Sequence, residues 1–92
     1  LYAGDTLKIG RDERADYQVC DDHERPVISR EHCYIKVAED GASVVIYDTS
    51  LNGLFVNGVK VTTATLADGD CLLLGRNKRD EEGPTLRLRL LS

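Results

Sequence analysis

Turn-forming residues interrupt this chain at intervals of about ten residues, and the segments between them are too short and too apolar for amphipathic helices. We expect strands at 6–10, 17–19, 31–37, 43–47, 54–56, 59–61, 71–75 and 86–90. About eight or nine short strands with turns between them are typical of an all-β protein, here an antiparallel β-sandwich. Ligand-binding loops are then expected at one end of the sandwich.

Two of the expected strands indicate where the core lies. In the segment 31–37 the two-residue period places Cys33, Ile35 and Val37 on the core face. It places His32, Tyr34 and Lys36 on the opposite face. The run Val44-Val45-Ile46 is β-branched throughout and predicts a central strand. The segment 21–28, which contains Pro26, is expected to be a loop.

Two Asn-Gly pairs lie close together in the stretch 48–58. Asn57-Gly58 separates two apolar segments and predicts a two-residue hairpin turn. Asn52-Gly53 follows the polar residues 48–50, so we expect it to close a surface loop after the fourth strand.

Composition narrows the classes of function. The formal net charge is -4 and there is no basic run, so the chain lacks the electrostatic footprint of a nucleic-acid-binding domain. No apolar run approaches the roughly 20 residues of a membrane span, and we expect no membrane association. The cysteines Cys20, Cys33 and Cys71 are odd in number and widely spaced, which favours reduced thiols in an intracellular protein. The length predicts one domain over residues 1–92, and the absence of Met suggests a fragment of a longer protein.

Three loops at strand ends carry hydrogen-bond donors. Arg11 follows the first strand, Ser29 and Arg30 precede the third, and Asn52 follows the fourth. A guanidinium group binds phosphate oxygens through paired, charge-assisted hydrogen bonds. Because Asn can both donate to and accept from an extended backbone, this set suits a phosphorylated peptide.

These segments resemble a known family. Ile9-Gly10-Arg11, Ser29-Arg30-x-His32 and Ser50-x-Asn52-Gly53-x-Phe55-Val56-Asn57-Gly58 are similar in order and spacing to the motifs of the forkhead-associated (FHA) domain. The resemblance runs from about residue 7 to residue 75 and on to the final strand near residue 90. It implies an eleven-stranded sandwich of the FHA/SMAD-like type, which leaves open that a first strand precedes Leu1.

The resemblance also implies a role for each matching residue. Arg11, Ser29 and Arg30 are expected to bind phosphate, and Asn52, with Ser50 and Leu51 as the neighbouring wall, to bind the peptide. Structural roles are expected for Gly10, His32, Gly53, Asn57 and Gly58. The implied partner is a phosphothreonine-containing protein or peptide, because the threonine methyl fills a small pocket, and no enzyme activity, cofactor or metal is expected. Family membership further suggests an intracellular protein, nuclear in preference to cytoplasmic.

Two positions depart from the family pattern, and two alternatives stay open. Leu54 stands where the family usually has Thr or Ser, and Leu51 where several members have a peptide-contacting Thr or Ser.

One alternative is a phosphate-independent or self-associating module that uses a sheet face or the closing strand. The other is a zinc or hydrolase site, which would draw on Cys20-x-x-His23, His32-Cys33 or Ser29 with His32. The segment 76–82 is expected to be a solvated charged loop.

Overall fold

The computed structural model describes residues 4–19, 27–40, 43–76, 79 and 81–88, which form strands, turns and loops. The strands are β1 (Thr6–Gly10), β2 (Tyr17–Gln18), β3 (Cys33–Val37), β4 (Val44–Asp48), β5 (Leu54–Val56), β6 (Val59–Val61), β7 (Thr63–Leu66), β8 (Cys71–Leu74) and β9 (Thr85–Arg87). Over these residues, no helix is long and apolar enough to cross a membrane.

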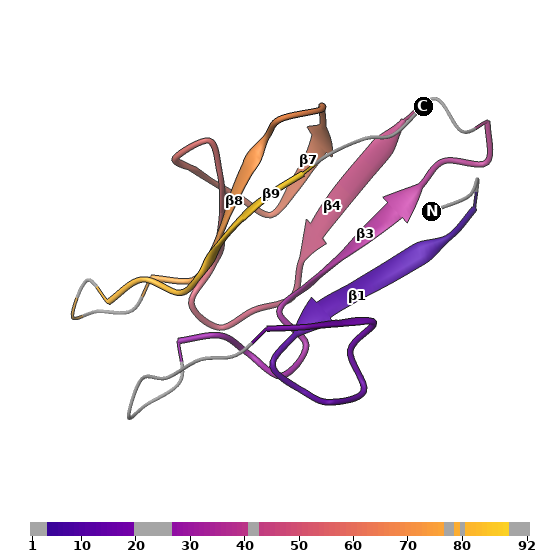
Figure 1. Ribbon diagram of the computed structural model, residues 1–92. Coiled ribbons are helices and arrows are strands. Elements are labelled where there is room, and N and C mark those ends of the chain that lie inside the picture. The colour runs from indigo at the N-terminus through magenta and orange to yellow at the C-terminus, as the bar shows by residue number, and fades with distance from the viewer. Residues whose placement is uncertain (1–3, 20–26, 41–42, 77–78, 80, 89–92) are drawn as a thin grey trace.

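The strands form two sheets (Figure 1). One has the order β2-β1-β3-β4-β7 and the other β6-β5-β8-β9. The predicted all-β sandwich is confirmed, and the neighbouring strands are antiparallel apart from β1 and β2, which pair in parallel. This parallel pair arises because the charged connection 11–16 loops back, so that Tyr17 lies beside Ile9.

The core lies between the two sheets. The first sheet contributes the buried residues Ile9, Cys33, Ile35, Ile46 and Leu66, and the second contributes Leu54, Leu72 and Leu74. The predicted inward face of β3 is therefore confirmed from Cys33 onward. The placement of His32 on the outer face is wrong, because β3 begins only at Cys33 and His32 is fully buried. The two-residue period applies to extended backbone and does not reach back into the turn before the strand.

Several predicted strands are confirmed to within about two residues at their ends, and one strand was missed. The missed strand is β7, whose sequence Thr-Ala-Thr-Leu lacks the large alternating apolar residues that mark the others. It pairs with β4 and makes β4 an interior strand, as the β-branched run predicts. Residues 89 and 90 of the predicted closing strand and most of the predicted loop 21–28 lie outside the described residues.

The predicted hairpin is confirmed. Strands β5 and β6 pair antiparallel through Val56 and Val59, with Asn57 at φ 50° and Gly58 at φ 85° between them. Positive φ at both central residues defines a type I′ turn, whose twist matches that of the flanking strands. The Asn57 side chain donates to Asp70 Oδ1 (3.0 Å) and accepts from the backbone N–H of Cys71 (3.0 Å), which ties the hairpin to the start of β8.

Candidate functional site

Three segments converge at one end of the sandwich: the end of β1, the segment 27–32 before β3, and the loop 49–53 after β4 (Figure 1). The backbone N–H of Arg11 donates to Ser29 O (3.2 Å), and that of Thr49 donates to His32 O (3.0 Å). A Cβ atom on Gly10 would lie 1.9 Å from Arg30 O, so this approach of β1 to the second segment requires glycine. The donors that were expected to cooperate are thus brought to one place.

His32 links two of these segments from inside the protein. Its Nδ1 accepts the backbone N–H of Ser29 (3.1 Å), and its Nε2 lies 2.7 Å from Gly53 O. Because Nδ1 accepts, the proton of the neutral ring resides on Nε2, which donates to Gly53. Burial lowers the pKa of His32, against the opposing effects of the Gly53 hydrogen bond and the charge of Asp48. The ring is therefore a neutral bridge between the Ser29 turn and the Asn52 loop.

Arg11 stands directly after β1 and is half-buried. Its Nε donates to Ile28 O at 2.9 Å, and Ile28 is itself almost fully buried, so the guanidinium is held by an anchored carbonyl. This bond leaves the fork formed by Nη1 and Nη2 for other acceptors. Among the described residues Arg11 forms no ion pair with a carboxylate, so a pairing with Asp12 or Glu13 is not what positions it.

The Ser29 hydroxyl is oriented by the loop after β4. Its Oγ accepts the backbone N–H of Leu51 (3.0 Å), so the hydroxyl hydrogen can point to another acceptor. Ser50 is turned inward, because its backbone N–H (2.9 Å) and its hydroxyl both donate to Asp48 Oδ1. The Leu51 side chain is 90% exposed beside them. Arg30 is also exposed, and its carbonyl accepts the backbone N–H of Asp12 (3.3 Å).

Asn52 is fixed through one half of its carboxamide. Its Nδ2 donates to Val27 O at 2.9 Å, and Val27 is 1% exposed. The following Gly53 has φ 88°, a left-handed conformation that closes the loop. The Lys60 side chain lies where a side chain on Gly53 would otherwise point. Leu54, which departs from the family pattern, is fully buried at the start of β5 and packs in the core.

Residues 7–75 match the family model for the FHA domain. The chain belongs to the FHA domain family.

Relatives of this FHA domain come from bacteria and from eukaryotes. It is 34% identical over 84 residues, 91% of its length, to the ABC transporter ATP-binding/permease protein Rv1747 of Mycobacterium tuberculosis. It is 39% identical over 59 residues, 61% of its length, to the E3 ubiquitin-protein ligase CHFR of Xenopus tropicalis. The chain spans only 9% of the length of either protein. Because bacteria have no nucleus, membership of the family does not support the expected nuclear location.

The fold of this FHA domain resembles that of a solved phosphopeptide complex. The N-terminal FHA domain of Rad53p from S. cerevisiae, in complex with a phosphothreonine peptide, is 26% identical. The match has a TM-score of 0.75 and covers 95% of this chain and 68% of that chain. The alignment therefore extends over nearly the whole of this chain.

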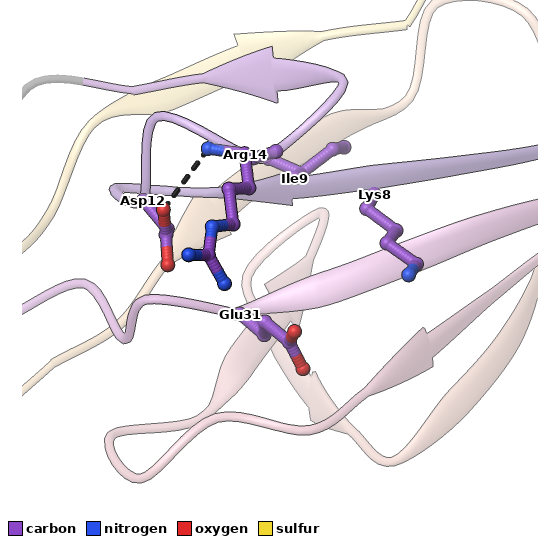
Figure 2. A pocket seen from close by; sticks show the side chains of 6 residues that line it. Lys8, Ile9, Asp12, Arg14 and Glu31 are labelled. Atoms are coloured by element: carbon purple, nitrogen blue, oxygen red, sulfur yellow. Dashed lines mark hydrogen bonds between the residues drawn. The ribbon is translucent and has the colours of Figure 1, made fainter.

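This FHA domain also has a pocket of about 130 Å³, none of whose lining residues belongs to the donor set (Figure 2). Its lining residues are Lys8, Ile9, Asp12, Arg14, Ala15 and Glu31. Arg14 extends from the connection after β1 toward Glu31, and its backbone N–H donates to Asp12 Oδ1 (2.9 Å). Two cations and two carboxylates give this pocket no net charge, so it is a poor site for an anion.

Two basic residues near Asn52 were not predicted as site residues. A Cβ on Gly53 would lie 3.0 Å from Lys60 Cε, so the Lys60 side chain lies across this glycine. Arg76 donates its backbone N–H to Asn52 O (3.0 Å) and pairs with Glu82 (3.2 Å). Arg76 is thus tied to the site at the start of the predicted charged loop, whose residues 77, 78 and 80 lie outside the described residues. The position of Arg76 directly after a buried strand was the signal available in the sequence.

The metal and hydrolase alternatives find little support in the described residues. No group of three or more His, Cys, Asp and Glu side chains there could hold a metal ion, and Cys20 and His23 lie outside them. Both ring nitrogens of His32 are engaged, and the ring accepts the backbone N–H of Ser29 instead of its hydroxyl. Burial, aided by the charge of Asp48, raises the pKa of the Cys33 thiol to about 12, so it remains protonated at neutral pH.

Proposed function

We propose that this FHA domain binds a phosphothreonine-containing segment of a partner protein and thereby recruits that protein in signalling. The observation that carries the proposal is the Arg11 guanidinium, which is oriented through Nε on the Ile28 carbonyl and has no carboxylate partner among the described residues. A positioned, unpaired guanidinium is well suited to a phosphate because its fork forms two parallel charge-assisted hydrogen bonds. The phosphothreonine peptide of the Rad53p complex supports the same ligand class.

In this proposal Arg11, Ser29 and Arg30 hold the phosphate. Ser29 contributes a hydroxyl donor that the Leu51 N–H already orients, and Arg30 contributes a second, exposed cation. Asn52 holds the peptide backbone through its carboxamide oxygen, which has no partner among the described residues. Ser50 and Leu51 form the adjacent wall, with the exposed Leu51 side chain facing outward.

Structural roles are proposed for the remaining motif residues. His32 fixes the distance between Ser29 and Asn52 by bridging their segments. Gly10 permits the close approach of β1, and Gly53 closes the Asn52 loop. Asn57 and Gly58 keep the neighbouring hairpin in register.

The test is a binding titration with three matched peptides. An oriented phosphothreonine library first selects a sequence, which is then made with phosphothreonine, phosphoserine or unmodified threonine. We expect binding in that order, with the unmodified peptide the weakest. Arg11→Ala should lose about 2 kcal/mol, roughly thirtyfold in affinity, because a charge-assisted pair is removed.

Arg14→Ala is the matched control, because Arg14 is a nearby exposed arginine that lines the pocket of Figure 2 and takes no part in the proposed site. Its affinity for the phosphothreonine peptide should equal that of the unmodified domain. Equal binding of the phosphorylated and unmodified peptides would refute the proposal. The proposal would also be refuted if the Arg11→Ala and Arg14→Ala variants bound the phosphothreonine peptide with the same affinity.

We infer that these residues act by binding and not by catalysis, in an intracellular setting. The three cysteines are odd in number and widely spaced in the sequence, which favours reduced thiols in an intracellular protein. This inference concerns the FHA domain alone. The chain spans 9% of the length of two relatives, a transporter and a ubiquitin ligase, so the activity of a longer protein would depend on its other parts.

Self-association through the closing strand is the second candidate. Within the described part of the chain, strand β9 is an edge of its sheet, and it borders an apolar groove of about 280 Å³. The groove is lined by Leu7, Ile9, Tyr17, Ile35, Leu72, Thr85, Leu86, Arg87 and Leu88. An exposed edge beside apolar surface can pair with another strand. Light scattering without any peptide distinguishes the two, because only this candidate predicts a dimer.

A further inference from the structure

The outer face of the first sheet differs in charge from the chain as a whole. Strands β1, β3, β4 and β7 are neighbours in this sheet (Figure 1), and the two-residue period turns every second residue away from the core. Their register aligns the outward residues in two rows, one of Lys8, Tyr34, Tyr47 and Thr63 and the other of Thr6, Lys36, Val45 and Thr65. These rows contain two lysines and no carboxylate, although the formal charge of the chain is -4.

The acidic residues of the described chain lie almost entirely outside its strands. The one carboxylate within a described strand is Asp48, at the end of β4. It lies opposite the buried Cys33 and accepts hydrogen bonds from Ser50, so it does not neutralise the outer face. The negative charge of the chain is therefore carried by turns and loops, and this sheet face stays positive.

The two lysines lie diagonally across the pairing of β1 with β3. Lys8 is opposite Tyr34, which is two residues before Lys36. Diagonal neighbours on one face of an antiparallel pair are about 7–8 Å apart. Both lysines are exposed, and neither forms an ion pair with a described residue, although Glu31 lines the same pocket as Lys8 (Figure 2). Two like charges this close repel each other, so negative charge placed between them is favourable.

Two tyrosines form a rigid centre beside the lysines. The rings of Tyr34 and Tyr47 stack, with centroids 4.9 Å apart and ring planes 18° apart, and both residues are half-buried. A stacked ring has little freedom left to lose when a partner packs against it. Tyrosine is also one of the residues that contribute most to binding energy at protein interfaces. The face thus combines unpaired cations with an ordered aromatic surface.

We propose that the outer face of the first sheet binds an extended acidic segment of a partner protein, with two carboxylates at alternate positions on Lys8 and Lys36. In an extended chain alternate side chains point the same way and are about 6.6–6.8 Å apart, which matches the diagonal spacing of the lysines. Adjacent carboxylates would point to opposite sides. Tyr34 neighbours both lysines, so a segment that spans them passes beside its ring.

The charge of the domain favours a short acidic segment over a nucleic acid as the ligand. A phosphate backbone carries a charge on every nucleotide, and the acidic loops of this chain would repel a long polyanion. A segment with two carboxylates needs only the two lysines. Complementary charge of this kind mainly selects partners and raises association rates.

The experiment is an NMR titration of the ¹⁵N-labelled domain with two unphosphorylated peptides of equal composition. Gly-Ser-Glu-Ser-Glu-Ser-Gly has alternate carboxylates, and Gly-Ser-Glu-Glu-Ser-Ser-Gly has adjacent ones. We expect both to bind weakly at low ionic strength, with amide shifts at Lys8, Tyr34 and Lys36. Exposed ion pairs contribute modestly, so the alternate peptide should bind about two- to fivefold more tightly than the adjacent one.

Variants of one lysine test the assignment. Lys36→Ala should remove the advantage of the alternate peptide, whereas Lys36→Arg keeps the charge and should retain it. Lys60→Ala is the matched control, because Lys60 is an exposed lysine on β6 of the other sheet, and it should bind both peptides like the unmodified domain. The amide spectrum of each variant shows directly whether it is folded.

The proposal is overturned if the two peptides bind alike, if their shifts lie on another surface, or if Lys36→Ala keeps the preference. It is also overturned if an oligouridylate shifts the same amides at lower concentration than the alternate peptide. Shifts there that grow with domain concentration alone would mean that a second copy occupies the face, which overturns it as well.

This surface is independent of the proposed phosphothreonine site. It contains none of Arg11, Ser29, Arg30 and Asn52. Arg11→Ala should therefore leave binding of the acidic peptides unchanged, and Lys36→Ala should leave binding of a phosphothreonine peptide without acidic residues unchanged. Failure of either proposal then leaves the result for the other intact.

Discussion

The two Asn-Gly pairs look alike in the sequence, but the structure uses their asparagines differently. Asn57 adopts positive φ, and its carboxamide is engaged at both ends, by Asp70 and by the backbone of Cys71. Asn52 donates to Val27 O, while its carboxamide oxygen has no partner among the described residues. Hydrogen-bonding capacity that the fold leaves unused is what a ligand can take up. The comparison separates a turn that stabilises the fold from a loop that is prepared for binding.

The largest expected effect is on stability at the hairpin. Asn57→Ala removes two side-chain hydrogen bonds and places at positive φ a residue that tolerates this conformation less well than Asn, so we expect a loss of about 2 kcal/mol in the free energy of unfolding. Urea denaturation measures it. Asn57→Gly keeps the positive φ accessible and should lose less. Affinity of the folded Asn57→Ala domain for the selected phosphothreonine peptide should be unchanged, and a tenfold drop would break the comparison.

The reverse pattern is expected at Asn52. Asn52→Ala removes a single internal hydrogen bond, worth about 1 kcal/mol of stability, but also the proposed contact with the peptide backbone. Affinity for the same peptide should fall about tenfold, as measured by titration calorimetry. Asn57→Ala is the matched control for this loss. If Asn52→Ala binds like the unmodified domain, Asn52 is only a turn residue.

The sequence predicts local features of this contrast and misses those that depend on contacts between distant segments. The type I′ hairpin follows from Asn57-Gly58 and its apolar flanks, because turn type is set by the residues of the turn itself. The buried position of His32 does not, because it depends on how the segment before β3 packs against the Asn52 loop. Lys60 was assigned no role for the same reason, since its contact with Gly53, just before β5, depends on the pairing of β5 with β6.

The family motifs predict which segments form the site. They do not predict how the other side chains of those segments are oriented. The segments containing Arg11, Ser29 and Asn52 do come together, as their order and spacing suggest. The inward turn of the Ser50 hydroxyl toward Asp48 was not foreseen, because a hydroxyl in a loop can point either way and the sequence does not determine which. Strand β7 was missed because its threonine-rich sequence has no strong period.

The stability contributed by the binding loop and by the hairpin should be lost in different pH ranges. At the binding loop the titrating group is His32. Its pKa is lowered in the folded state by burial, so the unfolded chain takes up the proton first as the pH falls. Stability should be complete above the ordinary histidine pKa of about 6.5 and decline below it until the folded pKa is reached. Urea denaturation at pH 7.5 and at pH values below 6.5 checks this. His23→Asn removes the other histidine and should leave the decline in place; if the decline disappears, His32 is not its source.

The smallest expected effect is at the hairpin, in a more acidic window. Hydrogen bonds from the Ala67 backbone and the Asn57 side chain lower the pKa of Asp70 from its ordinary value of 3.8. The unfolded chain is therefore protonated first below that value, and the stability that Asp70 contributes is lost as the pH falls toward its folded pKa. Asp70 is only partly buried, so the loss should be slight, and NMR titration of its carboxyl group is the more sensitive measurement. Asn57→Ala removes one of the two hydrogen bonds and should move the Asp70 pKa back toward 3.8, whereas Asn52→Ala should leave it where it is. A shift in both variants would mean that the two regions are coupled, and the contrast between the turn and the binding loop would no longer hold.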